Sequence, residues 1–105
     1  VLSGDVHSSW AAELRRGDRD VGVELVAPGV SSKVPADMRG RGGVIELQNP
    51  HIRWQDTEHR GWVVHTVTAD EWTSEFRLVD DADRPGTPVE PAQRLTVEAG
   101  ARRFS

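Results

Sequence analysis

The residues best suited to chemistry in this chain are Asp5 and His7, which stand two apart in the segment Gly4-Asp5-Val6-His7. A carboxylate oxygen is a hard metal ligand and an imidazole nitrogen a borderline one, so the pair offers two different donors. On extended backbone, residues two apart project to the same side, about 6.5–7 Å apart at Cα. Two metal ions roughly 3.5–4 Å apart could then each take one ligand from this segment. Gly4 leaves room for backbone to approach an ion or a phosphate.

The same pair also has a purely structural interpretation. Asp5 and His7 could form a hydrogen bond with each other that stiffens a loop, with no metal involved. A D-x-H triplet is short enough to occur often by chance, so the spacing alone leaves both interpretations open. The elements around the segment must therefore be considered.

Short apolar runs separated by turn residues predict that these elements are mostly β-strands. Residues 1–3 are expected to end a strand at Gly4, and residues 21–27 to form a half-buried strand that Pro28 halts. Residues 9–14 fit a strand or a helix, and the same holds for residues 45–49.

The second half of the chain predicts an antiparallel meander. Strands are expected at residues 62–68 and 72–79, a loop at 80–91, and a last short strand at 95–98. The alternation in the second of these places one set of side chains in the core, namely Trp72, Ser74, Phe76 and Leu78. It places the other set on a solvent face, namely Thr73, Glu75 and Arg77.

Composition excludes several classes of function. The net charge is −4, which gives no electrostatic footprint for nucleic acid. No apolar run approaches the ~20 residues that span a bilayer, so no membrane partner is expected. There is no cysteine, which excludes disulfides and thiolate chemistry within these 105 residues.

Four segments in order resemble the C-terminal part of the alkaline phosphatase D family of calcineurin-like metallophosphoesterases. They are SGDVHSSW, APGVSS, NPH and RGW. The resemblance runs over about residues 1–80. It implies that residues 1–105 are the C-terminal part of one metallophosphoesterase domain whose N-terminal half is absent. The implied fold class is α/β, a four-layer α/β/β/α sandwich of which this portion is mostly β with little helix.

The resemblance also implies roles for the two candidate ligands. Most of the superfamily closes its ligand set with a Gly-His-x-His loop, and Gly4-Asp5-Val6-His7 resembles a version with Asp in the first position. Asp5 would then bind calcium and His7 iron(III), in a binuclear centre that hydrolyses phosphate mono- or diesters. The other ligands would come from the missing N-terminal half, so we expect the isolated chain to be inactive. Family likeness further implies a secreted or periplasmic protein.

The remaining histidines have weaker claims to function. His51, in the NPH segment, is a candidate for lining the substrate pocket, and a turn histidine bonded to backbone is the favoured alternative. His65 lies in a Val-rich run and is predicted to be structural, and His59 is predicted to be solvated.

The tryptophans are interpreted mainly as structural residues. Trp10, three residues beyond His7, is predicted to pack beneath the loop and support the metal ligands. Trp62 and Trp72 are predicted to anchor the core.

Two other classes of function compete with the phosphatase hypothesis. The chain could be a non-catalytic small β-sandwich that binds a ligand, with the Asp5 and His7 pair incidental. It could also be an assembly domain that uses its strands for protein contacts.

Overall fold

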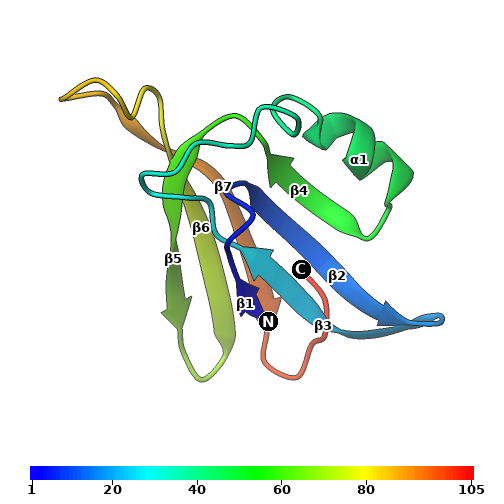
Figure 1. The fold of residues 1–105 in the computed structure, drawn as a ribbon. Coiled ribbons are helices and arrows are strands. Elements are labelled where there is room, and N and C mark those ends of the chain that lie inside the picture. Colours follow the sequence, from blue (N-terminus) through cyan, green and yellow to red (C-terminus); the bar gives the residue numbers. More distant parts are fainter.

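The strands lie in two sheets that face each other (Figure 1). The computed structural model describes residues 1–105, with the elements β1 (Leu2–Ser3), β2 (Ser9–Arg16), β3 (Arg19–Val26), α1 (Gly42–Gln48), β4 (Ile52–Asp56), β5 (Arg60–Val67), β6 (Glu71–Val79) and β7 (Val89–Glu98). The strand orders are β1-β3-β2-β4 and β5-β6-β7. Only the β1–β3 pair is parallel. The predictions of a mostly β portion with little helix and of an antiparallel meander are confirmed.

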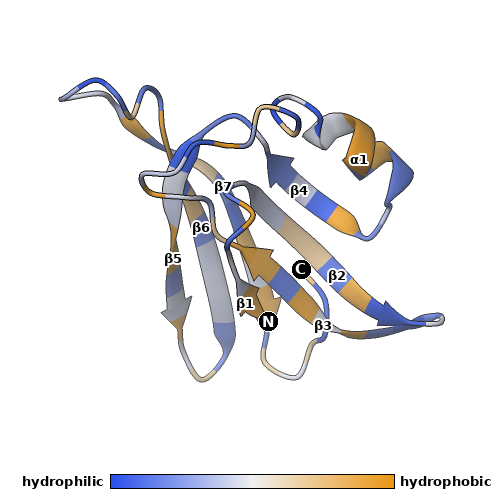
Figure 2. Cartoon of the chain, in the orientation of Figure 1, coloured by the Kyte–Doolittle hydropathy of each residue, from blue (hydrophilic) through white to orange (hydrophobic).

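The core lies between the two sheets. Ala11 on β2 and Leu25 on β3 pack with Phe76 of β6, and Phe104 joins them from the C-terminal tail. The ring of Trp54, on β4, lies 4.7 Å from that of Phe76. Figure 2 shows hydrophobic residues along β3 and a hydrophilic tip on the β2–β3 hairpin. Burial of aromatic surface across the sheets is the main stabilising contribution that this arrangement offers.

The alternation predicted for β6 holds with one exception. Phe76 and Leu78 are buried, as predicted, but Thr73 is buried as well, at 4 % exposure. The prediction of a solvent-facing Thr73 is wrong because β6 is the middle strand and its neighbours cover this position. The Thr73 Oγ1 atom lies 3.4 Å from Oγ1 of Thr96 on β7.

The last strand, β7, begins six residues earlier than predicted, at Val89. Pro91 lies inside it, where a proline normally argues against a strand. β7 is an edge strand, and its pairing with β6 is irregular between Phe76 and Arg77. A proline is tolerated at such a place because it need not donate to a neighbouring strand.

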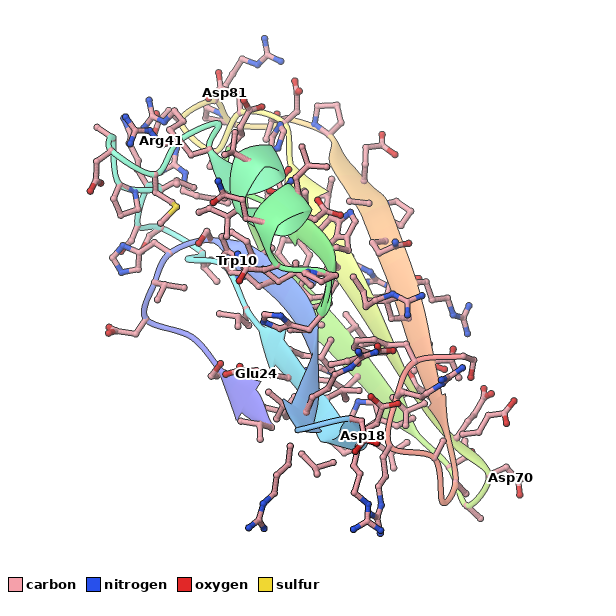
Figure 3. All side chains as sticks on the ribbon, turned by 90° about the vertical axis from the view of Figure 1, so that its right-hand side faces the viewer. Trp10, Asp18, Glu24, Arg41, Asp70 and Asp81 are labelled. Carbon is pink, nitrogen blue, oxygen red and sulfur yellow. The ribbon has the colours of Figure 1, made fainter.

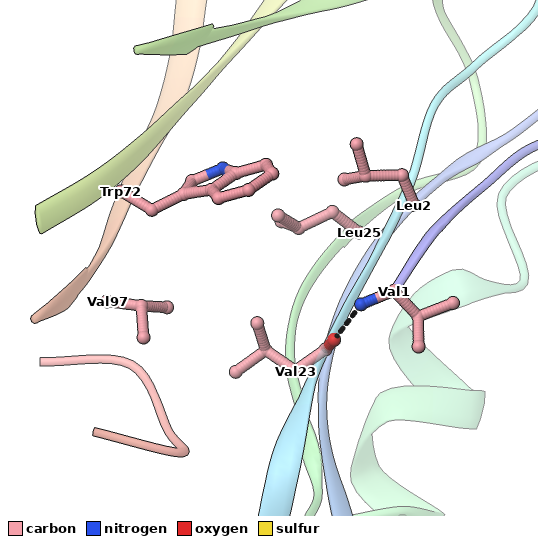
Figure 4. A pocket seen from close by; sticks show the side chains of 6 residues that line it. All are labelled: Val1, Leu2, Val23, Leu25, Trp72 and Val97. Atoms are coloured by element: carbon pink, nitrogen blue, oxygen red, sulfur yellow. Dashed lines mark hydrogen bonds between the residues drawn. The ribbon is translucent and has the colours of Figure 1, made fainter. Parts of the chain in front are cut away.

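The tryptophans are only partly where the sequence predicts them. Trp62 is 37 % exposed, so its prediction as a core anchor is wrong, and Trp54 fills that role. Trp72 is half-buried and lines an apolar pocket of about 120 Å³. Figure 4 shows this pocket between the ends of β1 and β3 and those of β6 and β7, beside the hydrogen bond from the amino group of Val1 to the carbonyl of Val23 (2.7 Å).

The pairing of β5 with β6 explains why the RGW segment has a glycine at position 61. A Cβ atom at this position would collide with the backbone of Arg77 on β6, so only glycine allows the two strands to pair here. The Gly61 amide also donates to the carbonyl of Gly29 at 3.2 Å. This bond ties the start of β5 to the segment that leaves β3.

His65 belongs to a polar cluster near the end of the meander. The Trp72 Nε1–H donates to His65 Nδ1 (3.2 Å) and to Ser74 Oγ (3.1 Å), and these two acceptors lie 2.8 Å apart. Because the indole nitrogen only donates, Nδ1 of His65 must act as an acceptor in this contact. The structural role predicted for His65 agrees with this geometry, and a neutral ring satisfies the contact with Trp72.

The cluster makes stability depend on pH. Burial lowers the pKa of His65 below its ordinary value of 6.5. As the pH falls below ~6.5, the unfolded chain takes up a proton that the folded chain resists, so the free energy of unfolding should fall until the folded pKa is passed. Urea denaturation at a series of pH values between 7.5 and 5 measures this loss. His65→Asn should show a smaller loss than the native protein, and equal losses would contradict the prediction.

Candidate metal-binding loop

The segment Gly4–Ser8 forms an arch over the end of β3. Ser3 on one side and Trp10 on the other both pair with Val26, the last residue of β3. Because β1 and β2 flank β3, the arch spans two strand spacings, or about 9–10 Å. The amide of Ala27 donates to the carbonyl of Ser3 at 2.9 Å, so the chain leaving β3 lies directly beside the arch.

The backbone of the arch is bent and not extended. Asp5 has a φ of 72° and His7 a φ of 58°, both in the left-handed region. The expectation of extended backbone is therefore wrong. Left-handed backbone costs roughly 1–2 kcal/mol for a residue with a Cβ atom, although Asp and His tolerate it better than most. Strain of this kind is often found at functional sites, where the surrounding structure holds it in place.

Both candidate ligands have side chains without partners inside the chain. Asp5 is exposed and His7 is half-buried. The nearest side-chain hydrogen bonds along the sequence join Ser3 to Glu24 and Trp10 to Ser8, and none involves either ligand. The alternative of an Asp5–His7 hydrogen bond that stiffens the loop is therefore not what the structure shows.

Trp10 is linked to the end of the arch. Its Nε1–H donates to Oγ of Ser8 at 2.8 Å, and Ser8, which follows His7, is only 1 % exposed. The next residue, Ser9, is fully buried, and its hydroxyl has no hydrogen-bond partner. These contacts fix the point where the arch joins β2. The role of Trp10 as a support for metal ligands stays a prediction.

The donor types of Asp5 and His7 suit a metal centre. Asp5 supplies an oxygen for a hard cation and His7 a nitrogen for a transition metal, and neither side chain must break an internal bond to bind. No group of three or more His, Cys, Asp or Glu side chains converges anywhere in residues 1–105. Protein metal sites usually have at least three protein ligands. The loop fits a metal centre only as a contributor of two ligands.

The structure does not bring His51 to the loop. The carbonyl of His51 accepts a hydrogen bond from the amide of Glu13 at 2.8 Å. Glu13 lies four residues along β2 from Ser9, which is about 13 Å. The His51 side chain is exposed. Its place in a substrate pocket stays a prediction.

A second histidine lies nearer to the loop and was not predicted. Asp56 pairs with Ser9, the residue that follows the arch. Its carboxylate binds Nδ1 of His59 at 2.8 Å and also accepts the backbone amide of His59 at 2.7 Å. The side chain of His59 is 37 % exposed, in line with its predicted solvation, but its bond to Asp56 was not predicted. The sequence feature that could have indicated this is the D-x-x-H spacing, since a turn aspartate commonly binds amides two or three residues on.

The fold and the loop together define a β-sandwich portion that presents a candidate pair of metal ligands above the end of a central strand. The family model for "PhoD-like phosphatase" matches residues 1–76. Alkaline phosphatase D of Bacillus subtilis (strain 168) is 34 % identical over 95 residues, which cover 85 % of this chain and 16 % of that protein. The chain therefore belongs to the PhoD-like phosphatase family, and it spans less than a fifth of the curated relative that it matches.

A solved structure agrees with this assignment. The structure described as "Structure of PhoD" matches with a TM-score of 0.79 at 29 % identity, over 98 % of this chain and 21 % of that one. It supports the identification of the fold as part of a PhoD structure, as the sequence predicts. No helix in the chain is long and apolar enough to cross a membrane.

Proposed function

We propose that this chain contributes the last ligand loop of a binuclear metal centre that hydrolyses phosphate esters. The observation that carries the proposal is the arch Gly4–Ser8, where the side chains of Asp5 and His7 have no partners inside the chain. The chain that carries this arch belongs to a family of phosphatases. In this proposal Asp5 binds the harder cation, calcium, and His7 binds iron(III), because oxygen donors suit calcium and imidazole suits transition metals. Bound ions of this kind supply a hydroxide nucleophile near neutral pH and neutralise charge on the phosphoryl oxygens.

The residues of this chain would act by holding the metal ions and by orienting the side chains that bind them. The left-handed backbone at Asp5 and His7 directs both side chains from one short arch, and the Trp10–Ser8 hydrogen bond fixes the end of that arch. The precision of such a site depends on how firmly its ligands are held. The remaining ligands would come from sequence that this chain does not contain. The proposed substrate is a phosphate ester. We also propose that the protein is exported from the cytoplasm.

The proposal predicts that activity requires metal and more than these 105 residues. The full native polypeptide should hydrolyse p-nitrophenyl phosphate or its bis-ester, lose this activity on chelation, and regain it with calcium and iron. The 105-residue chain alone should show no turnover above background. Release of p-nitrophenolate measures both. Turnover by the isolated chain would contradict the proposal that further ligands are needed. Activity that chelation does not reduce would contradict the metal mechanism.

A further inference from the structure

A polar pocket that shares no lining residue with the arch is rich in cations. Its volume is about 190 Å³, and its lining residues are Lys33, Val34, Arg39, Glu58, Arg60 and Asp83. Three positive side chains thus face one pocket in a chain whose net charge is −4. Lys33 and Arg39 come from the segment between β3 and α1, Arg60 begins β5, and Asp83 comes from the β6–β7 loop.

Arg60 gives the pocket a fixed centre. Its side chain is only 14 % exposed. One guanidinium nitrogen, Nη1, donates to the carbonyl of Ser31 at 2.9 Å, which sets the orientation of the planar group. Arg39 is restrained as well, through Nη2 and the carbonyl of Val34 at 3.4 Å. A guanidinium that is already oriented loses little further entropy when it binds an oxyanion.

Asp83 occupies the position of an anion in this pocket. Its Oδ1 atom lies 2.9 Å from Nη2 of Arg60, and its Oδ2 atom lies 3.4 Å from Nζ of Lys33. Arg60, and then Lys33, hold the pKa of this carboxyl below its usual value. The Asp83 side chain is nevertheless 62 % exposed and sits on a loop of exposed residues. Ion pairs at this exposure are weak, so an external anion can displace them.

We propose that this cationic pocket is a phosphate-binding site and that Asp83 is its internal competitor. A carboxylate and a phosphate use the same donors on arginine and lysine, but phosphate carries more charge and a third acceptor oxygen. Arg39, which Asp83 does not contact, supplies the additional cation. Glu58 lines the same pocket, and its negative charge opposes binding. Once Asp83 has moved away, three positive side chains and Glu58 leave the pocket a net charge of +2. The site needs no metal and does not depend on Asp5 or His7.

The test is a calorimetric titration of pyrophosphate into the full native polypeptide, with a chelator present so that metal ions cannot bind the probe. Asp83→Asn should bind pyrophosphate about three- to tenfold more tightly than the native protein, because it removes the competing charge. Lys33→Gln should bind it more weakly. Asp70→Asn is the matched control, since it makes the same charge change at the opposite end of the molecule from Asp81 and the β6–β7 loop (Figure 3). It should leave the affinity unchanged.

Four results would overturn the proposal. The first is equal affinity, or no binding, in the native protein and Asp83→Asn. The second is the same gain in Asp70→Asn, which would assign the effect to net charge. The third is unchanged binding in Lys33→Gln. Because the side chain of Lys33 is exposed, weaker binding in this variant is not explained by misfolding. The fourth is loss of binding in the double variant Asp5→Ala/His7→Ala, which would place the probe at the arch; the proposal expects this variant to keep the site. These results do not depend on the proposed metal centre, so they would stand even if Asp5 and His7 bound no metal.

Discussion

His7→Ala in the full native polypeptide is expected to lose one metal ion and to lower kcat/KM roughly 10³-fold. A bound metal ion contributes several kcal/mol to the transition state of hydrolysis, which corresponds to a factor of this size. Within residues 1–105 the other three histidines have contacts of their own: the backbone of His51 with Glu13, the ring of His59 with Asp56, and the ring of His65 with Trp72. Metal content by mass spectrometry and initial rates with p-nitrophenyl phosphate measure the two effects together.

Val6→Ala is the matched control for this variant. Val6 stands between the two ligands, is 51 % exposed and offers no donor atom. It should keep both the metal and most of the rate. The ligand assignment is refuted if His7→Ala retains normal metal content and turnover.

Phe76→Ala is expected to lower the free energy of unfolding by about 3–5 kcal/mol. Phe76 is fully buried, and its ring packs against Trp54 at 4.7 Å and against residues of both sheets. Alanine would leave a cavity at the contact between the sheets, and a small domain cannot fill such a space without moving strands. Urea denaturation followed by tryptophan fluorescence measures the change, because Trp54 lies at the site.

Val67→Ala provides the comparison for this second variant. Val67 ends β5 and is 61 % exposed, so its truncation should change the free energy of unfolding by less than about 0.5 kcal/mol. Similar losses for the two variants would show that the contact between the sheets is not the main source of stability.

The strands of the meander could be predicted because their side chains alternate. In β6 the sequence places Phe76 and Leu78 on one face, and this regularity is a local property that the fold preserves. The burial of Thr73 could not be predicted in the same way, because it depends on neighbours that are distant in sequence. The start of β7 was missed for a related reason. A proline argues against a strand unless the strand lies at an edge, and sequence alone does not say which strands are edges.

Helix α1 and β2 show the limit of local patterns in short segments. Residues 42–48 begin with two glycines, and the helix has no side-chain cap, so nothing in the sequence favours a helix strongly over a strand. β2 has a buried Glu13 at a core-facing position, which disturbs its apolar alternation. That carboxylate is tolerated because Arg53 of β4 binds it at 3.1 Å.

The candidate site could be predicted in its residues but not in its shape. The types and spacing of Asp5 and His7, together with the family resemblance, indicate a ligand pair. The left-handed backbone at both positions could not be predicted, because neither residue is a glycine and such conformations are uncommon elsewhere. The Asp56–His59 pair was missed because its proximity to the loop depends on the pairing of β4 with β2.

The backbone of the arch has a consequence for how the protein fails under stress. Asp5 and His7 hold a conformation that their own preferences disfavour, and their side chains make no internal bonds that would resist opening. Segments of this kind open in local fluctuations at a lower free energy than the sheets beneath them. Warming should therefore disorder the arch while the two sheets remain folded, and inactivation at moderate temperature would then be reversible on cooling.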